Sequence, residues 1–409
     1  MSSDEPDTKP DIKEVEDRGE TIGMMEPLLI PQASKYKGGL ADLAVDLTEA
    51  STALRKTLPD GIVKALSDLV RSMNCYYSNL IEGHDTHPID IERALKEDYS
   101  EDPEKRDLQL EAKAHISVQK WIDDGGLADR AVSAEGLLET HRRFCELLPD
   151  ELLWVENKTT GERLPVIPGE PRRRDVEVGR HVAISPGAIP RFLGRFETAY
   201  KNLGRVDSII AAATAHHRLL WIHPFLDGNG RVARLMSYAM LDQALDTGGI
   251  WSIARGLAKN EKAYKDHLAA CDLPRRNDLD GRGNLSEEEL AKFTAFFIKI
   301  CIDQVTFMES LVQPDRLRNR ILIWTKEEIM ADRLPQKAEI VLETILYRGE
   351  LPRADVPKLL GGTDRSARRV TSVLLEQGVL ASESTRSNLK LAFPATLASR
   401  WMPGLFPDK

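Results

Sequence analysis

The chain has 409 residues, of which 42% are hydrophobic and 30% are charged, an ordinary balance for a folded protein of two or three domains. Its net charge is −9, and the eight acidic and three basic side chains of residues 1–20 leave −4 for the rest of the chain. That small charge argues against binding nucleic acid through bulk electrostatics. Four well-separated cysteines and the lack of a membrane-length apolar run predict a cytoplasmic protein without disulfides or membrane contact.

In chain order, residues 1–20 are predicted to be disordered, because they are acidic, polar and free of aromatic side chains. Apolar residues then recur at helical spacing and predict helices at about 40–54, 62–80, 105–122 and 133–148. The second of these helices is expected to end near Gly83. Prolines, glycines and short alternating runs in residues 151–190 predict one β-hairpin in an otherwise helical protein.

Helices are predicted to resume at about 189–203, 207–222 and 231–246, with Asp207 as the N-cap of the middle one. Ser286, with Glu289 three residues on, predicts the start of another helix that runs to about Leu311. The last part of the chain has a different pattern. It predicts three short helices at 337–347, 353–360 and 364–377, and a small hairpin with strands at 379–380 and 389–391. This order is typical of a winged helix-turn-helix.

The most informative segment is 223–234, with the sequence HPFLDGNGRVAR, which follows an apolar helix and opens another. Its Gly-Asn-Gly turn leads into a helix N-terminus, where unpaired backbone N–H groups and the helix dipole favour an anion. Arg231 and Arg234 lie three residues apart on one helix face, and two guanidinium groups beside such a turn suit a polyphosphate. Asp227 could hold a Mg²⁺ that bridges phosphates, and His223 could accept a proton from an attacking hydroxyl. The set is typical of a nucleotide-transfer site.

This segment resembles the signature of the Fic family, HxFx[D/E]GNGRxxR, and matches every position that the signature specifies. The resemblance implies a protein adenylyltransferase that moves AMP from ATP, with Mg²⁺, to a Ser, Thr or Tyr hydroxyl of a target protein. It implies His223 as the base and Asp227 as the Mg²⁺ ligand. It also implies an anion hole formed by Gly228, Asn229 and Gly230, in which Asn229 orients the α-phosphate. Arg231 would contact the phosphates, and Arg234 would hold the γ-phosphate.

A second segment, SNLIEG at 78–83, is similar to the family's inhibitory motif, [S/T]xxxE[G/N]. The resemblance implies that Glu82 pairs with Arg234 and displaces the γ-phosphate, so that ATP binds unproductively. Ser78 and Gly83 would complete this inhibitory motif. Because the motif precedes the signature, the chain resembles the subclass whose inhibitory helix lies N-terminal to the Fic core.

Two further elements follow from the resemblance. The predicted hairpin fits the family's flap at about 173–185, which would hold the target backbone along a strand edge through Val178, Gly179, Arg180, His181 and Val182. Asn260, in a helix after the signature, occupies a region that the family uses near the adenine base. An ordinary solvent-facing role for Asn260 is equally compatible with the sequence.

The C-terminal module leaves two readings open. Arg365, Arg368 and Arg369 fall on its predicted recognition helix, as they would in a major-groove reader. However, residues 335–395 hold nine basic and seven acidic side chains, a small excess for a DNA-binding domain. Contact with a target protein or with a second copy of the chain is the other reading, and the sequence settles neither homodimer formation nor self-modification.

We therefore predict a mainly α-helical protein with a Fic-type core, a β-hairpin flap and a winged helix. Four parts are expected. An acidic leader (1–20) precedes an N-terminal helical region with the inhibitory helix (21–104). The Fic core (105–312) and the winged helix-turn-helix domain (313–409) follow. The predicted function is protein adenylylation held back by Glu82. The alternatives are removal of AMP by Glu82 and a metal-bound water, and a DNA-binding regulator whose Fic core senses a nucleotide.

Overall fold

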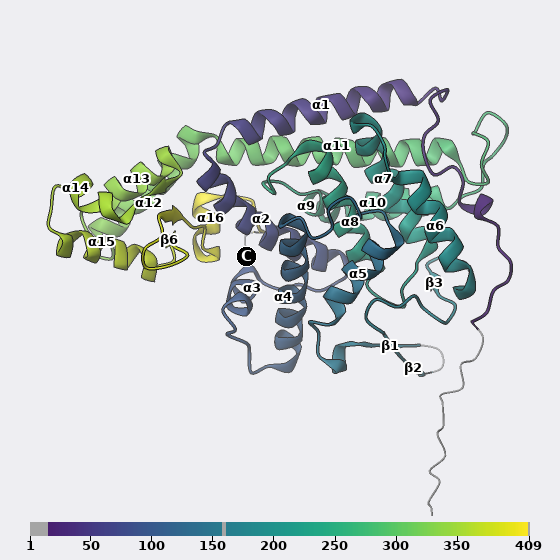
Figure 1. The fold of residues 1–409 in the computed structure, drawn as a ribbon, viewed down its shortest axis with the longest axis horizontal. Helices are drawn as coiled ribbons and strands as arrows, with labels where there is room; N and C mark the ends of the chain where they lie inside the picture. The colour runs from purple at the N-terminus through teal and green to yellow at the C-terminus, as the bar shows by residue number, and fades with distance from the viewer. Residues whose placement is uncertain (1–14, 158–160, 408–409) are drawn as a thin grey trace, which may run out of the picture.

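The computed structural model describes residues 15–157 and 161–407, and it is mostly helical, as the sequence predicts (Figure 1). Five helices precede the strands: α1 (Lys37–Lys56), α2 (Asp60–Ile81), α3 (Pro88–Leu95), α4 (Pro103–Asp123) and α5 (Ala134–Cys145). Between the flap and the C-terminal elements lie α6 (Ile189–Tyr200), α7 (Arg205–Ile222), α8 (Asn229–Leu245), α9 (Ala254–Lys259), α10 (Glu261–Cys271), α11 (Glu287–Val312) and α12 (Pro314–Met330). No helix within the described ranges is long and apolar enough to cross a membrane.

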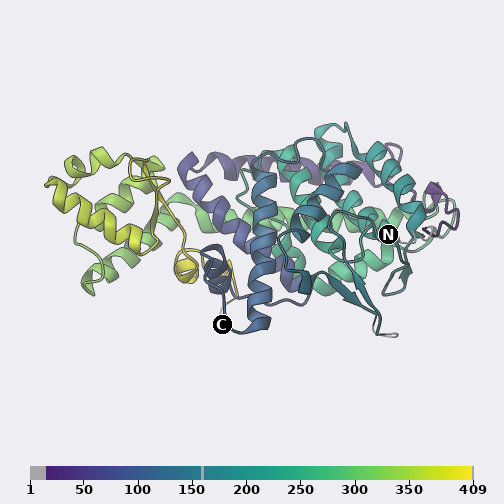
Figure 2. The ribbon, with the colours of Figure 1, turned by 60° about the horizontal axis from the view of Figure 1, so that its bottom comes forward.

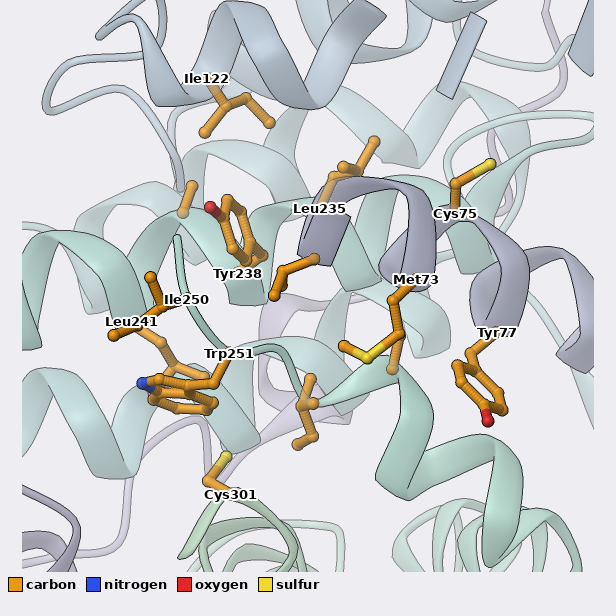
Figure 3. Close-up of a cluster of buried hydrophobic side chains, with 14 of the residues drawn as sticks. Met73, Cys75, Tyr77, Ile122, Leu235, Tyr238, Leu241, Ile250, Trp251 and Cys301 are labelled. Carbon is orange, nitrogen blue, oxygen red and sulfur yellow. The ribbon is translucent and has the colours of Figure 1, made fainter. Parts of the chain in front are cut away.

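The long helices α1 and α11 lie side by side along one edge of the molecule, and α7 and α8 pack against each other in its middle (Figure 1). The core also joins α2 to α8. In Figure 3, Met73 and Tyr77 of α2 share a buried cluster with Tyr238 of α8 and with Trp251. The Trp251 indole also donates to Ser51 Oγ of α1 at 3.0 Å. Burial of these large side chains fixes α2 against α8, and so fixes the C-terminal end of α2 near the start of α8.

The C-terminal elements project from one end of the molecule (Figure 2). Their order is α13 (Ala338–Arg348), β5 (Glu350–Leu351), α14 (Val356–Leu360), α15 (Asp364–Glu376), β6 (Leu380–Ala381) and β7 (Leu389–Leu391). The three strands form an antiparallel sheet in the order β5-β7-β6. The sequence predicts the β6–β7 hairpin and misses β5, whose two residues are too few for an alternating pattern. The winged-helix assignment stays a prediction, as do the domain boundaries.

After α16 (Ala398–Trp401), the end of the chain returns to α2 (Figure 1). Tyr77 Oη donates to the Leu405 carbonyl at 3.1 Å, and the ring of Phe406 meets the ring of Tyr76 edge-on with 5.8 Å between centroids. Leu405 is fully buried. The helix that carries the inhibitory motif is therefore packed by the C-terminal tail as well as by the core.

The structure corrects several sequence predictions. Residues 15–20, expected to be disordered, are bound to the base of the flap, where Arg18 pairs with Asp175 at 2.7 Å and Glu20 accepts from Ser185; residues 1–14 lie outside the described part. The region 151–190 holds two hairpins instead of one, since β1 (Trp154–Glu156) pairs with β2 (Arg163–Pro165) ahead of β3 (Glu177–Val178) and β4 (His181–Val182).

Helix boundaries also differ from the prediction in places. Asp207 is not an N-cap, because α7 begins earlier with Gly204 in that position, and the Asp207 carboxylate pairs with Lys37 at 2.5 Å. The short helix α3 and the helix α12 are absent from the prediction. Ser286 is the N-cap of α11 as predicted, with its hydroxyl accepting from the Glu289 amide at 3.1 Å.

The bond between Tyr77 and Leu405 predicts a measurable contribution to stability. We expect Tyr77→Phe to lower the free energy of unfolding by about 1 kcal/mol, because it leaves a buried carbonyl without its donor. The measurement is urea unfolding followed by circular dichroism. Tyr347→Phe is the matched control, since Tyr347 is 86% exposed, and an equal loss in both variants would contradict the assignment.

Candidate active site

The site is built on the loop that joins α7 to α8, residues 223–228, here called the signature loop. His223 ends α7 in the left-handed conformation, with φ of 50°, and its N–H still donates to the Leu219 carbonyl. Gly228 precedes α8 with φ of 80°, a conformation that glycine adopts without strain. Because Gly228 offers no side-chain cap, the first N–H groups of α8 keep their hydrogen-bonding capacity for another partner.

Asn229 and Phe225 hold the signature loop in shape. The Asn229 side chain accepts from the Phe225 amide at 3.0 Å and donates to the Phe225 carbonyl at 2.9 Å. The Phe225 ring is fully buried and stacks on His141 with 3.9 Å between centroids. Asn229 thus shapes the loop with both ends of its amide, and its expected contact with the α-phosphate stays a prediction. The sequence analysis missed His141, which lies more than eighty residues away in the chain.

The ring of His223 has one nitrogen engaged and one left to react. His223 Nδ1 lies 3.2 Å from the Leu220 carbonyl, and since a carbonyl only accepts, Nδ1 carries the hydrogen. Nε2 therefore holds the lone pair. Burial lowers the pKa of His223 to about 4, so the ring is neutral at pH 7. A neutral imidazole with a free Nε2 is in the form that a general base needs.

Arg172 supports His223 from the chain segment before the flap. Its Nε donates to the His223 carbonyl at 2.8 Å, and its backbone N–H donates to the Pro224 carbonyl at 2.8 Å. Its remaining nitrogens reach the carbonyls of Arg174 and Ile184, at either end of the flap. Burial lowers the pKa of Arg172 to about 10. Sequence reasoning missed this residue, because an arginine that serves only backbone carbonyls has no motif.

Arg234 is held by residues of the predicted inhibitory motif, 78–83. Its guanidinium is buried, with Nε donating to Ser78 Oγ at 2.8 Å, and Nη2 reaching the Ser78 carbonyl at 3.2 Å and Glu82 Oε1 at 2.5 Å. Burial raises the pKa of Glu82, but the guanidinium of Arg234 outweighs it and brings the pKa below its ordinary value. A Cβ on Gly230 would clash with Glu82 Oε1, so that carboxylate lies over the first turn of α8.

Arg231 is buried and has different partners. It pairs with Glu111 of α4, and its Nη1 lies 3.6 Å from Asp227 Oδ2. The second oxygen of Glu111 lies 2.6 Å from Nδ1 of His84, two residues after Glu82. The sequence analysis found neither Glu111 nor His84. A lone glutamate on a helix and a histidine in a turn carry no signal without the fold.

The single carboxylate of Asp227 fits a Mg²⁺ that arrives with phosphates. Its side chain is 59% exposed, and it is a hard oxygen ligand of the kind that Mg²⁺ prefers. Mg²⁺ is commonly bound through one or two carboxylates together with substrate phosphates and waters, so one protein ligand is sufficient. In the described ranges, no cluster of three or more His, Cys, Asp or Glu side chains forms a self-contained metal site.

The predicted flap lies close to His223. Val178 pairs with His181 across the β3–β4 hairpin, and the turn between them contains Gly179 with φ of 63° and the exposed Arg180. His181 Nε2 donates to the Trp221 carbonyl at 2.7 Å, two residues before His223. Val182 is 62% exposed. A cavity of about 250 Å³ adjoins this region, between the signature loop and β2.

The surroundings of Asn260 do not distinguish a nucleotide-binding role from a local structural one. It lies between α9 and α10, is exposed, and its amide donates to the Gly256 carbonyl of its own helix turn at 2.9 Å. Tyr264, one turn further on, is buried with its hydroxyl 2.6 Å from His216 Nε2. The contacts of Asn260 are local, and its role toward an adenine base stays a prediction.

Comparison with known proteins returns the family that the signature segment resembles. Residues 131–241 match the model of the Fic/DOC family. "Protein adenylyltransferase Fic" of Drosophila virilis is 28% identical over 198 residues, covering 48% of this chain and 36% of that protein. The protein of the same name from Drosophila erecta is 29% identical over 171 residues, covering 41% and 32%. The aligned part spans about a third of the length of these relatives.

Among solved structures, a Fic family protein from Desulfovibrio desulfuricans has a similar fold. The TM-score is 0.51 at 17% sequence identity, and the match covers 89% of this chain and 98% of that one. At this identity the likeness is one of fold, and it extends well beyond residues 131–241.

The different environments of His223 and His84 predict pKa shifts in opposite directions. We expect His223 to titrate near pH 4, because burial disfavours its charged form. We expect His84 to titrate above its ordinary pKa of 6.5, because its hydrogen bond to Glu111 favours the charged form. The measurement is NMR titration of the imidazole signals, assigned with His223→Ala and His84→Ala. Coincident titrations of the two rings would contradict the described environments.

Proposed function

We propose that this chain transfers AMP from ATP to a hydroxyl group of a protein and that Glu82 holds the activity back. The observation that carries the proposal is the juxtaposition along α8. A neutral imidazole lies at one end of the signature loop, unpaired N–H groups lie at the other, and two buried guanidiniums follow on the helix. One of these guanidiniums is bound by a carboxylate of the inhibitory motif.

His223 supplies the base. Its Nδ1–H bond to the Leu220 carbonyl leaves Nε2 to accept the proton of a target Ser, Thr or Tyr hydroxyl. The freed oxygen attacks the α-phosphorus of ATP, a P–O bond to the target forms, and the bond to pyrophosphate breaks. Arg172 holds the backbone of His223 in place, and with it the imidazole ring, through a bond to the His223 carbonyl. Because the pKa of His223 is about 4, the base is unprotonated throughout the physiological range.

The start of α8 supplies the phosphate site. Its first N–H groups and the helix dipole stabilise phosphate charge, and the glycines at 228 and 230 allow close approach of the backbone. Arg231 contacts the phosphates and Arg234 holds the γ-phosphate. Charge-assisted bonds from two guanidiniums are strong enough to orient a triphosphate for in-line attack. Asp227 would hold the Mg²⁺ that neutralises phosphate charge when ATP is bound.

Glu82 explains how the activity is restrained. Its carboxylate lies on the Arg234 nitrogen that a γ-phosphate needs, and over the first turn of α8. Two anions cannot share this place, because each repels the other and only one satisfies the guanidinium. ATP therefore binds with its γ-phosphate displaced until the end of α2 moves.

The flap supplies the place for the target. β3 and β4 form a two-stranded sheet, so their outer edges offer backbone groups to an added strand. The bond from His181 to Trp221 keeps this hairpin next to the signature loop. A target segment paired with the flap would present its hydroxyl to His223, with a neighbouring side chain in the adjoining cavity.

Label transfer from α-labelled ATP with Mg²⁺ tests the proposal. We expect Glu82→Gly to label protein at least tenfold faster than the wild type, because Arg234 becomes free for the γ-phosphate. Glu82→Gly/His223→Ala should lose this labelling. Glu82→Gly/His267→Ala is the matched control and should keep it, since His267 lies on α10 and packs on Phe296.

The same assay tests the metal ligand. Glu82→Gly/Asp227→Ala should label more slowly at low Mg²⁺ and recover in part at high Mg²⁺, because phosphates and water still hold the ion weakly. Labelling that is equal with and without His223, or that persists after Mg²⁺ is chelated, would contradict the proposed roles.

A further inference from the structure

The turn that carries Glu82 is connected to both arginines of α8. Glu82 and Ser78 bind Arg234 directly. His84, two residues further on, reaches the second arginine through Glu111, which binds His84 Nδ1 with one oxygen and Arg231 with the other. Arg231 Nη2 also lies 3.4 Å from His84 Nδ1. Residues 82–84, here called the inhibitory turn, therefore contact α8 through the Glu82–Arg234 ion pair and through His84, which meets Arg231 both directly and by way of Glu111.

Glu111 is a fixed anchor for this turn. It lies on α4, a helix of the core, and it is 7% exposed. The guanidinium of Arg231 holds its Oε1, so its carboxylate has little freedom to rotate. His84 itself is partly exposed and has no role in the core. Its ring is thus a partly exposed group docked on a buried carboxylate.

The backbone makes the docking relevant to Glu82. Glu82 caps the C-terminus of α2, and Gly83 turns the chain with φ of 90°. The His84 amide then donates to the Asn79 carbonyl at 2.9 Å, which closes the turn. Because only Gly83 separates the two residues, a movement of the backbone that carries Glu82 away from α8 also moves His84 relative to Glu111.

We propose that His84 is a positioning residue for inhibition, which docks the inhibitory turn on Glu111 and so keeps Glu82 on Arg234. This inference deepens the proposed function and rests on it. Nothing in the inhibitory motif, whose specified positions end at Gly83, identifies His84. The docking adds a second attachment point, so displacing the backbone of the inhibitory turn from α8 breaks both carboxylate contacts.

Charge makes the docking sensitive to pH. The charged and titratable groups that face His84 are Glu111 of α4, Arg231 of α8 and Glu82 of its own turn. The bond to Glu111 raises the pKa of His84 above 6.5, while burial and Arg231 act against it. A group whose pKa is raised in the docked state stabilises that state below its ordinary pKa and loses the effect as pH rises through the raised value. Inhibition should therefore weaken as pH rises above 6.5.

The experiment compares the full-length wild type with His84→Ala, His84→Asn and His87→Ala, each alone and in a Glu82→Gly background. Asn places a neutral donor where Nδ1 was. His87 is the matched control, because it lies in the same connection and caps the Ile89 amide without touching either arginine. The first readout is hydrogen exchange of the amides at 82–84, which needs no substrate, and the second is AMP transfer from α-labelled ATP between pH 6 and 9.

We expect His84→Ala to speed exchange of these amides and AMP transfer by about threefold to tenfold, the range for losing a partly exposed charge-assisted bond. His87→Ala should change neither. In the Glu82→Gly background His84→Ala should leave the transfer rate unchanged, since no inhibition remains to be relieved. His84→Asn should keep slow exchange and abolish the pH dependence of inhibition.

Exchange in His84→Ala that equals the wild type would overturn the proposal. So would a change in transfer of equal size with and without Glu82, because His84 would then act on nucleotide or target. If Glu82→Gly transfers no AMP at all, the proposed function fails, while the exchange rates still decide whether His84 docks the turn.

Discussion

The arrangement of the site depends on one buried guanidinium that needs an anion. Arg234 is 3% exposed, and a charge buried to that extent is stable only when it is paired and hydrogen-bonded. Ser78 satisfies part of it, and the remaining Nη2 position is taken by Glu82. A γ-phosphate offers the same chemistry to the same nitrogen. Under the proposed function, the site therefore has two competing ways to complete one ion pair, and the choice between them would decide whether ATP lies in a productive position.

The remainder of the fold brings these two competitors to the same place. Core side chains pack α2 on α8 (Figure 3). The C-terminal tail packs on Tyr76 and Tyr77, and Glu111 connects α4 to both Arg231 and the inhibitory turn. On the opposite side of the signature loop, Arg172 ties the flap to His223. The proposed base His223 ends α7 and the proposed phosphate clamps are buried on α8, whereas Glu82 belongs to a helix end, which is the easier part to displace.

The sequence predicted what is local. Helical periodicity and the 223–234 motif locate α7, the signature loop and α8, and the resemblance of residues 78–83 to the family's inhibitory motif identifies Glu82 as a partner of Arg234. It did not predict Arg172, His141, Glu111 or His84, because each acts on a residue that is distant in the chain and none stands at a specified position of a recognised motif. It was also wrong about residues 15–20, whose bonds to the flap base override their disorder-like composition. Short strands such as β5 escape any pattern that needs several alternations.

The central claim is that Glu82 and the γ-phosphate compete for Arg234. A crystal structure of Glu82→Gly with Mg²⁺ and ATP tests it most directly. The account predicts that γ-phosphate oxygens lie within hydrogen-bond distance of the Arg234 guanidinium, with the α-phosphate over the first turn of α8 and facing His223 Nε2. A γ-phosphate bound elsewhere, while Arg234 stays on Ser78 with no anion beside it, would contradict the account.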